Sequence, residues 1–127
     1  MNKINIELTN AEEQIMQVLW KIEKGFVKDI LEHFNDPKPA YNTISTVVRI
    51  LEKKGLVSHK AYGNSHQYYP LISKKEYSKN HLSKFASDYF GNSIKDLVSF
   101  FSESNKLSIH EIDETIKMLN EIKNKKS

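Results

Sequence analysis

The stretch NTISTVVRILEKKGLVSHKAYGNSHQYYP, residues 42–70, changes its hydrophobic period halfway along. Before Gly55, apolar residues recur at the spacing of a helix, and after it they alternate as in a strand. The pair Gly63-Asn64 suits the positive φ angles of a tight reversal between "LVSHK" and "HQYYP". This stretch therefore predicts a helix followed by a two-stranded hairpin.

The helix expected over residues 42–53 has an apolar side and a polar, cationic side. At about 100° per residue, the apolar positions within about 60° of Ile44 are Val47, Val48 and Leu51. The opposite side, between about 140° and 200°, holds Asn42, Thr46, Arg49 and Lys53, flanked by Ser45 and Ile50. Small polar groups let a helix approach DNA base edges, and an arginine can reach guanine or a phosphate. An ordinary exposed helix face would more often carry Glu and Lys in mixed pairs.

The charge of the chain is concentrated around this helix. The formal net charge is +3 over 127 residues. Residues 40–70 hold four cationic side chains (Arg49, Lys53, Lys54 and Lys60) against Glu52 alone, whereas residues 1–39 carry more acids than lysines. A basic stretch of this kind indicates a nucleic-acid partner only together with a suitable geometry.

The residues before this stretch predict two further helices. Thr9 and Glu12 have the spacing of a capping box, which starts a helix over about residues 10–23 that stops at Gly25. A second helix is expected over about 27–34, before the helix-breaking "NDPKPA". Three helices followed by a hairpin is the order of a winged helix-turn-helix, in which the third helix enters the major groove and the hairpin touches the backbone.

Residues 73–127 predict three more helical segments that carry apolar stripes. They are a helix of about 17 residues from Ser73, a shorter segment in "SIKDLVSFFSES", and a last helix that Ser108 caps. These segments are too few and too short to enclose a core, so we expect a homodimer. The residues predicted to form the dimer contact are Phe85, Tyr89, Leu97, Phe101, Ile112, Ile116 and Leu119. The alternative is that this stripe folds back on its own winged domain.

The composition argues against several other classes of protein. The chain has no cysteine, which excludes disulfides, thiolate metal sites and a cysteine nucleophile. The five histidines are scattered, and no phosphate loop or nucleophile elbow is present, so neither an enzyme nor a metal or other cofactor is expected. No apolar run approaches the roughly 20 residues of a membrane span, and the N-terminus lacks the core of a signal peptide. We expect a cytoplasmic protein without membrane insertion.

Three blocks of the sequence resemble the BlaI/MecI-type penicillinase repressors. They are "LTNAEEQIMQVLW", "NTISTVVRILEKKGLV" and "YGNSHQYYPLISKKEY", and the resemblance runs from about Leu8 to the end of the chain. It implies a dimeric repressor that covers a palindromic operator with its N-terminal domains and dimerises through C-terminal helices. It also implies release from DNA when a membrane-bound β-lactam sensor-protease triggers cleavage in the dimerisation region.

The chain departs from that family pattern at three places. Ile50 stands where the family often has arginine, and Arg49 comes one residue earlier. The bond that matches the family's common Asn-Phe cleavage site is Phe100-Phe101. The C-terminal cysteines of the copper-responsive relatives are missing, which sets copper sensing aside.

Taken together, the sequence predicts a mainly α fold with a small β-hairpin wing: a winged helix-turn-helix DNA-binding domain over residues 1–72 and a helical dimerisation region over 73–127. The expected function is a sequence-specific transcriptional repressor that binds a palindromic operator as a homodimer. The predicted DNA contacts are Asn42, Thr43, Ser45, Thr46, Arg49, Lys53, Lys54 and Lys60. Two alternatives remain: a winged-helix regulator that responds to a small effector, and a protein-interaction module that binds no DNA.

Overall fold

The computed structural model describes residues 7–104 and 107–126. Its element order is three helices, a two-stranded hairpin and three more helices, which confirms the predicted fold class. By backbone contacts the chain divides into two compact units, Met1–Leu82 and Ser83–Ser127. The division falls inside the fourth helix, whereas the domain boundary predicted from the sequence lies after residue 72 and stays a prediction.

Helix α1, Asn10–Ile22, begins at the capping box that the sequence indicates. The backbone N–H of Glu12 donates to Thr9 Oγ1 over 3.2 Å, and Thr9 N–H donates to Glu12 Oε1 over 2.8 Å. The helix ends at Ile22, one residue earlier than expected, because Glu23 adopts a positive φ of 72°. The expected role of Gly25 as the stop signal is therefore wrong.

Gly25 instead joins the hairpin to the first helices. Its N–H donates to the carbonyl of Tyr68 over 2.9 Å, and Tyr68 N–H donates back to the Gly25 carbonyl over 2.8 Å. A Cβ at Gly25 would lie 2.7 Å from Ile22 Cδ1 and 3.2 Å from Asp29 Cβ. This close approach is why a residue without a side chain stands between α1 and α2.

Helix α2, Val27–Glu32, is shorter than the predicted 27–34. Its last turn tightens, because the N–H groups of His33 and Phe34 donate to carbonyls only three residues back. Lys38 Nζ then donates to the carbonyls of Leu31, Glu32 and Phe34 over 2.8–3.3 Å. The lysine, in the "NDPKPA" turn, thus satisfies two carbonyls at the C-terminus of α2 and one just beyond it.

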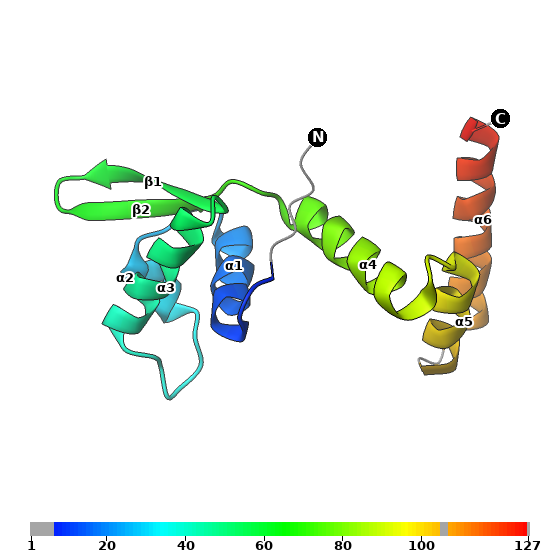
Figure 1. The fold of residues 1–127 in the computed structure, drawn as a ribbon, viewed down its shortest axis with the longest axis horizontal. Coiled ribbons are helices and arrows are strands. Elements are labelled where there is room, and N and C mark those ends of the chain that lie inside the picture. Colours follow the sequence, from blue (N-terminus) through cyan, green and yellow to red (C-terminus); the bar gives the residue numbers. More distant parts are fainter. Residues whose placement is uncertain (1–6, 105–106, 127) are drawn as a thin grey trace. The chain divides into compact units, whose positions relative to one another are not determined.

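Helix α3, Tyr41–Lys53, leads into strands β1, Val57–Tyr62, and β2, Ser65–Pro70. The strands pair antiparallel, from Val57 with Pro70 to Tyr62 with Ser65. Gly63 takes a φ of 61° at the tip, so the expected reversal at Gly63-Asn64 is confirmed, with strands slightly longer than predicted. Figure 1 shows the hairpin extending beyond the three helices as a wing.

One hydrophobic core holds the helices and the hairpin of the first unit together. Its fully buried side chains come from α1, α2, α3, the loop before β1 and the first residue of β1. The largest are Ile15, Met16, Leu19, Ile30, Val48, Leu51, Leu56 and Val57. Trp20 Nε1 donates to the Ile72 carbonyl over 2.9 Å, which fixes the chain where it leaves the hairpin. The Trp20 ring also packs against Tyr77, with ring centroids 5.4 Å apart.

The three remaining helices are α4, Lys74–Phe90, α5, Ile94–Ser104, and α6, Ile109–Lys126. A serine caps the start of each: Ser73, Ser93 and Ser108 accept from backbone N–H groups over 3.0–3.1 Å. Gly91 and Asn92 both have positive φ, which explains the break between α4 and α5. None of the helices in the described residues is long and apolar enough to cross a membrane.

Candidate nucleic-acid interface

Helix α3 turns its apolar stripe inward and its polar side outward. Ile44, Val48 and Leu51 are buried in the core. The predicted contact residues on the opposite side are exposed, except for half-buried Ser45: Asn42, Thr43, Thr46, Arg49 and Lys53. We call these six residues the outer face of α3. The sequence periodicity correctly placed Asn42, Thr46, Arg49 and Lys53 on the side away from the buried stripe, flanked by Ser45. Thr43, about 100° around the helix from Ile44, lies at the edge of this side.

Two polar contacts mark the borders of the outer face. On one side, Lys54 Nζ lies 2.8 Å from Glu12 Oε1 of α1. On the other, Glu52 Oε2 is hydrogen-bonded to His59 Nδ1 of β1. Helix α3 is therefore tied to α1 and to the wing through these neighbours, and the outer face between them stays open.

Arg49 lies in the middle of the outer face and is the single arginine of the chain. Its Nε donates to the Ser45 carbonyl one turn earlier over 3.3 Å. A guanidinium has five N–H donors in a fixed fork, so this one bond leaves the side chain able to meet a guanine edge or a phosphate.

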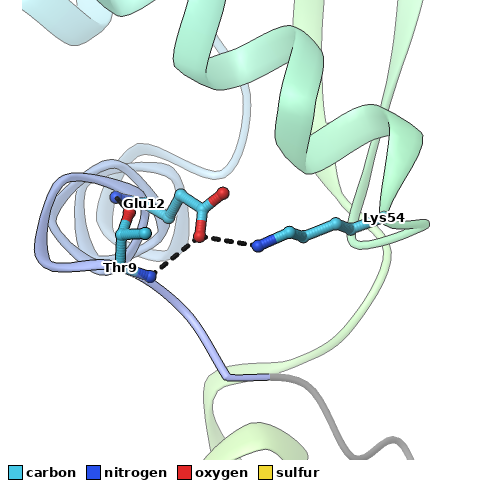
Figure 2. A network of polar contacts seen from close by, with 3 residues as sticks. All are labelled: Thr9, Glu12 and Lys54. Atoms are coloured by element: carbon cyan, nitrogen blue, oxygen red, sulfur yellow. Dashed lines mark hydrogen bonds and ion pairs between the residues drawn. The ribbon is translucent and has the colours of Figure 1, made fainter.

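The Thr9, Glu12 and Lys54 network joins the start of α1 to the end of α3 (Figure 2). Glu12 is only 3% exposed. Burial raises the pKa of its carboxyl, but hydrogen bonds from Lys54 and Thr9 outweigh burial and leave the pKa below its ordinary value. The carboxylate is therefore ionised and paired with Lys54 at neutral pH.

This contact changes the setting of Lys54, which the sequence placed among the phosphate-binding lysines. Its ammonium group is held on the α1 side, whereas Lys53 is exposed on the outer face. Sequence reasoning missed the pair because Glu12 and Lys54 are 42 residues apart. No local pattern connects a capping-box glutamate with a lysine after the third helix.

The wing carries Lys60 on one side and a histidine pair on the other. Lys60 is exposed, and its Nζ lies 5.3 Å from the centroid of the Tyr62 ring. On the opposite side of the hairpin, the rings of His59 and His66 stack with centroids 4.0 Å apart. Along the sequence the five histidines are scattered. Only the strand register brings these two together.

The predicted dimer contacts lie on helices that expose most of their apolar surface. Six of them are exposed and Leu97 is half-buried; the exposed ones are Phe85, Tyr89, Phe101, Ile112, Ile116 and Leu119. Among the described residues from Ser83 onward, Ala86 is the one buried side chain. Phe100 and Phe101, the predicted cleavage position, are exposed in the last turns of α5. No residue of α6 is buried.

Comparisons with known proteins agree with this architecture. The family model for penicillinase repressors matches residues 8–121. The penicillinase repressor of Bacillus licheniformis is 27% identical over 121 residues, which are 94% of each chain. The methicillin resistance regulatory protein MecI of Staphylococcus aureus is also 27% identical, over 94% of this chain and 98% of that protein.

A solved structure also resembles part of the chain. The solution structure of the DNA binding domain of the repressor BlaI has a TM-score of 0.50 and 28% identity. The likeness covers 61% of this chain and 94% of that domain. Together with the family match over most of the sequence, these findings show that the chain belongs to the penicillinase repressor family.

Proposed function

We propose that this protein is a sequence-specific DNA-binding transcriptional repressor. The observation that carries the proposal is the outer face of α3, a single accessible side made of small polar residues around one arginine. Such a face suits entry of the helix into a major groove, where small side chains permit close approach. Membership of the penicillinase repressor family and the likeness to the BlaI DNA binding domain support it.

The residues of this interface take different parts in DNA binding. Asn42, Thr43, Ser45 and Thr46 line the approach to the bases, and Arg49 supplies the directional contact that reads them. Lys53 and Lys60 contact phosphates, which carry no sequence information but add affinity. We give Lys54 a smaller part, because its ammonium group is already paired with Glu12.

The repressor acts as a homodimer on a palindromic operator. Helices α5 and α6 hold no buried side chain in the described residues, so their apolar stripes lack a core within one chain. Packing against a second copy would cover them. A dimer holds two recognition helices together, and the second then binds at a high effective concentration.

The regulated genes are those of β-lactam resistance, and proteolysis in the C-terminal region releases the repressor. The relatives named for penicillinase and methicillin resistance support the first part. The second part rests on the resemblance to the family. Phe100-Phe101 lies within α5, so this helix has to unwind locally before a protease can cut the bond. Such a cut would separate α6 from the DNA-binding unit and weaken the dimer.

A titration with promoter DNA tests the central claim. The purified protein is titrated against the duplex upstream of its own gene and against a scrambled duplex, at two salt concentrations. We expect tight, salt-sensitive binding to the promoter and weak binding to the scramble. Arg49→Ala should lose the preference between the duplexes, and Arg49→Lys should lose most of it while keeping its charge, because lysine lacks the bidentate fork.

Two outcomes would contradict the proposal in different ways. Equal, weak binding of the native protein to both duplexes would mean that α3 does not read sequence, and a protein-docking role would then replace the repressor. Unchanged preference in Arg49→Ala would leave a DNA-binding protein but show that the outer face of α3 is not the reading surface. Lys117→Ala in α6 removes a charge far along the sequence and serves as the control.

A further inference from the structure

Three ionisable side chains meet where the end of α3 faces the wing. Glu52 Oε2 of α3 is hydrogen-bonded to His59 Nδ1 of β1. The His66 ring of β2 lies parallel to the His59 ring, with an angle of 6° between the planes and 4.0 Å between the centroids. We call these residues the Glu52–His59–His66 cluster.

The strand register places the cluster on the inner side of the wing. His59 pairs with Tyr68 and Ala61 pairs with His66, so both imidazoles lie on the side that also carries buried Val57 and Tyr68. Glu52 and His59 are half-buried, and His66 is exposed. The cluster therefore opens to solvent through His66, in the corner between α3 and the wing.

The charge of this corner depends on the imidazoles. When both are neutral, the Glu52 carboxylate is a negative charge next to the outer face of α3, where it repels a DNA phosphate. A protonated His59 cancels that charge, and a second proton on His66 gives the corner a net positive charge. Because Glu52 offsets one imidazolium, the stacked rings can hold the second proton at a smaller electrostatic cost. Histidine is the side chain whose charge changes between about pH 5 and 8.

Tyr68 is a further ionisable side chain in ring contact with the cluster. The Tyr68 ring lies 5.7 Å from His59 and 6.2 Å from His66. Burial and the charge of Glu52 raise the pKa of the Tyr68 hydroxyl above its usual value, so Tyr68 stays neutral. Arg49 and Tyr41 also act electrostatically on the Tyr68 hydroxyl, and the charge of Arg49 opposes the rise in the pKa of this hydroxyl.

We propose that the Glu52–His59–His66 cluster is a proton-linked binding site for a backbone phosphate of DNA. The inference rests on the proposed function. When α3 lies in the major groove and the wing lies on the backbone, a phosphodiester passes through the corner between them. Protonated His66 binds this phosphate, while Glu52 holds His59. The complex then carries more protons than the free protein, so affinity rises as pH falls.

The test measures the Kd for the promoter duplex from pH 6 to pH 8 at constant ionic strength. We expect the native protein to bind about tenfold more tightly at pH 6 than at pH 8, which corresponds to an average uptake of about half a proton per complex over this range. His66→Gln should lose most of this gain. Glu52→Gln should bind more tightly than the native protein at pH 8 and show a flatter profile, because the repelling charge is gone. His33→Gln, at the end of α2, is the matched control and should keep the native profile.

A spectroscopic measurement follows the proton itself. At pH 7, addition of the promoter duplex should move the His66 ring signals in an NMR spectrum toward those of the protonated form. Inorganic phosphate at the same phosphate concentration should leave them in place. An equal shift with inorganic phosphate would reveal a general anion site and overturn the proposal. His66→Gln should melt within a degree or two of the native protein, since His66 is exposed.

The possible failures are distinguishable. If the native protein prefers its promoter but His66→Gln follows the same pH profile, the cluster takes up no linked proton and the inference is wrong, while the proposed function stands. If the native protein shows no preference for the promoter at any pH, the proposed function fails and the inference fails with it.

Discussion

The lysines near the outer face of α3 differ in the partner that each ammonium group has within the protein. Lys53 is exposed on that face, Lys60 lies on the wing over the Tyr62 ring, and Lys54 is paired with buried Glu12. Each phosphate contact adds about 0.9 to the slope of log affinity against log salt. We therefore expect Lys60→Ala to lower that slope by about one and to weaken binding equally for all sequences. Fluorescence anisotropy at four salt concentrations measures the slope.

The paired lysine supplies a contrast to Lys60. Lys54→Ala should change the salt slope less than Lys60→Ala does, because its charge is offset within the protein. Lys21→Ala, in the last turn of α1, is the control and should leave the slope unchanged. A Lys60→Ala variant with the native slope would show that the wing does not touch a phosphate through this lysine.

The Glu12 carboxyl makes the stability of the first unit depend on pH. Burial raises its pKa, but Lys54 and Thr9 together hold the pKa below the ordinary value of 4.5. The stabilisation is therefore present above pH 4.5 and is lost as the pH falls through the folded-state pKa. We expect Glu12→Gln to lower the free energy of unfolding at pH 7 by about 1.5 kcal/mol. This value is at the low end of the range for a hydrogen bond to a charged group, because Lys54 is partly solvated. Urea unfolding should show this difference shrinking as the pH falls below 4.5. A constant difference at every pH would contradict the assignment.

Between the helices, Gly25 decides how α1, α2 and β2 fit together. Its two backbone bonds to Tyr68 require the close approach that a Cβ would disturb at Ile22 and Asp29. Asp29 in turn accepts from Phe26 N–H over 2.9 Å at the start of α2. We expect Gly25→Ala to lower the free energy of unfolding by about 1–3 kcal/mol, measured by urea denaturation.

Ile22→Val removes the Cδ1 atom that a Cβ at residue 25 would meet. Gly25→Ala should therefore lower the free energy of unfolding by less in that background. Equal effects in both backgrounds would mean that the clash at Ile22 does not matter.

The same elements show which parts of the structure are predictable from sequence. The Thr9 and Glu12 spacing predicted the start of α1, and the apolar period of α3 predicted its exposed side, because both are local patterns. The role of Gly25 was mistaken, since its conformation serves a bond to Tyr68, 43 positions further on by the numbering. The pairing of Glu12 with Lys54 and the stacking of His59 on His66 were missed for the same reason. Such contacts depend on the packing of separate elements, which no periodicity within one element reveals.

The two units of the chain differ in how they bury apolar surface. The first unit encloses a core of aliphatic side chains. The second has apolar stripes on the end of α4 and on α5 and α6, with Ala86 as its one buried residue in the described range. Removal of apolar surface from water is the main favourable contribution to association. A second copy of the chain is the proposed source of the missing contacts, and α6 is the helix on which this is most directly tested.

The double variant Ile116→Glu/Leu119→Glu places two charges in the apolar stripe of α6. Both side chains are about half exposed in the single chain, so the variant should fold, whereas in a dimer the charges would be buried without partners. We expect a monomer by analytical ultracentrifugation, and operator affinity lower by roughly 100-fold or more, because the two recognition helices no longer bind as a linked pair.

Binding to a single half-site should be unchanged. Lys117→Glu lies about 100° or more around the helix from both positions and is the control, which should stay dimeric. If the double variant remained a dimer, or if the native protein were a monomer at micromolar concentration, α6 would not be the dimer contact.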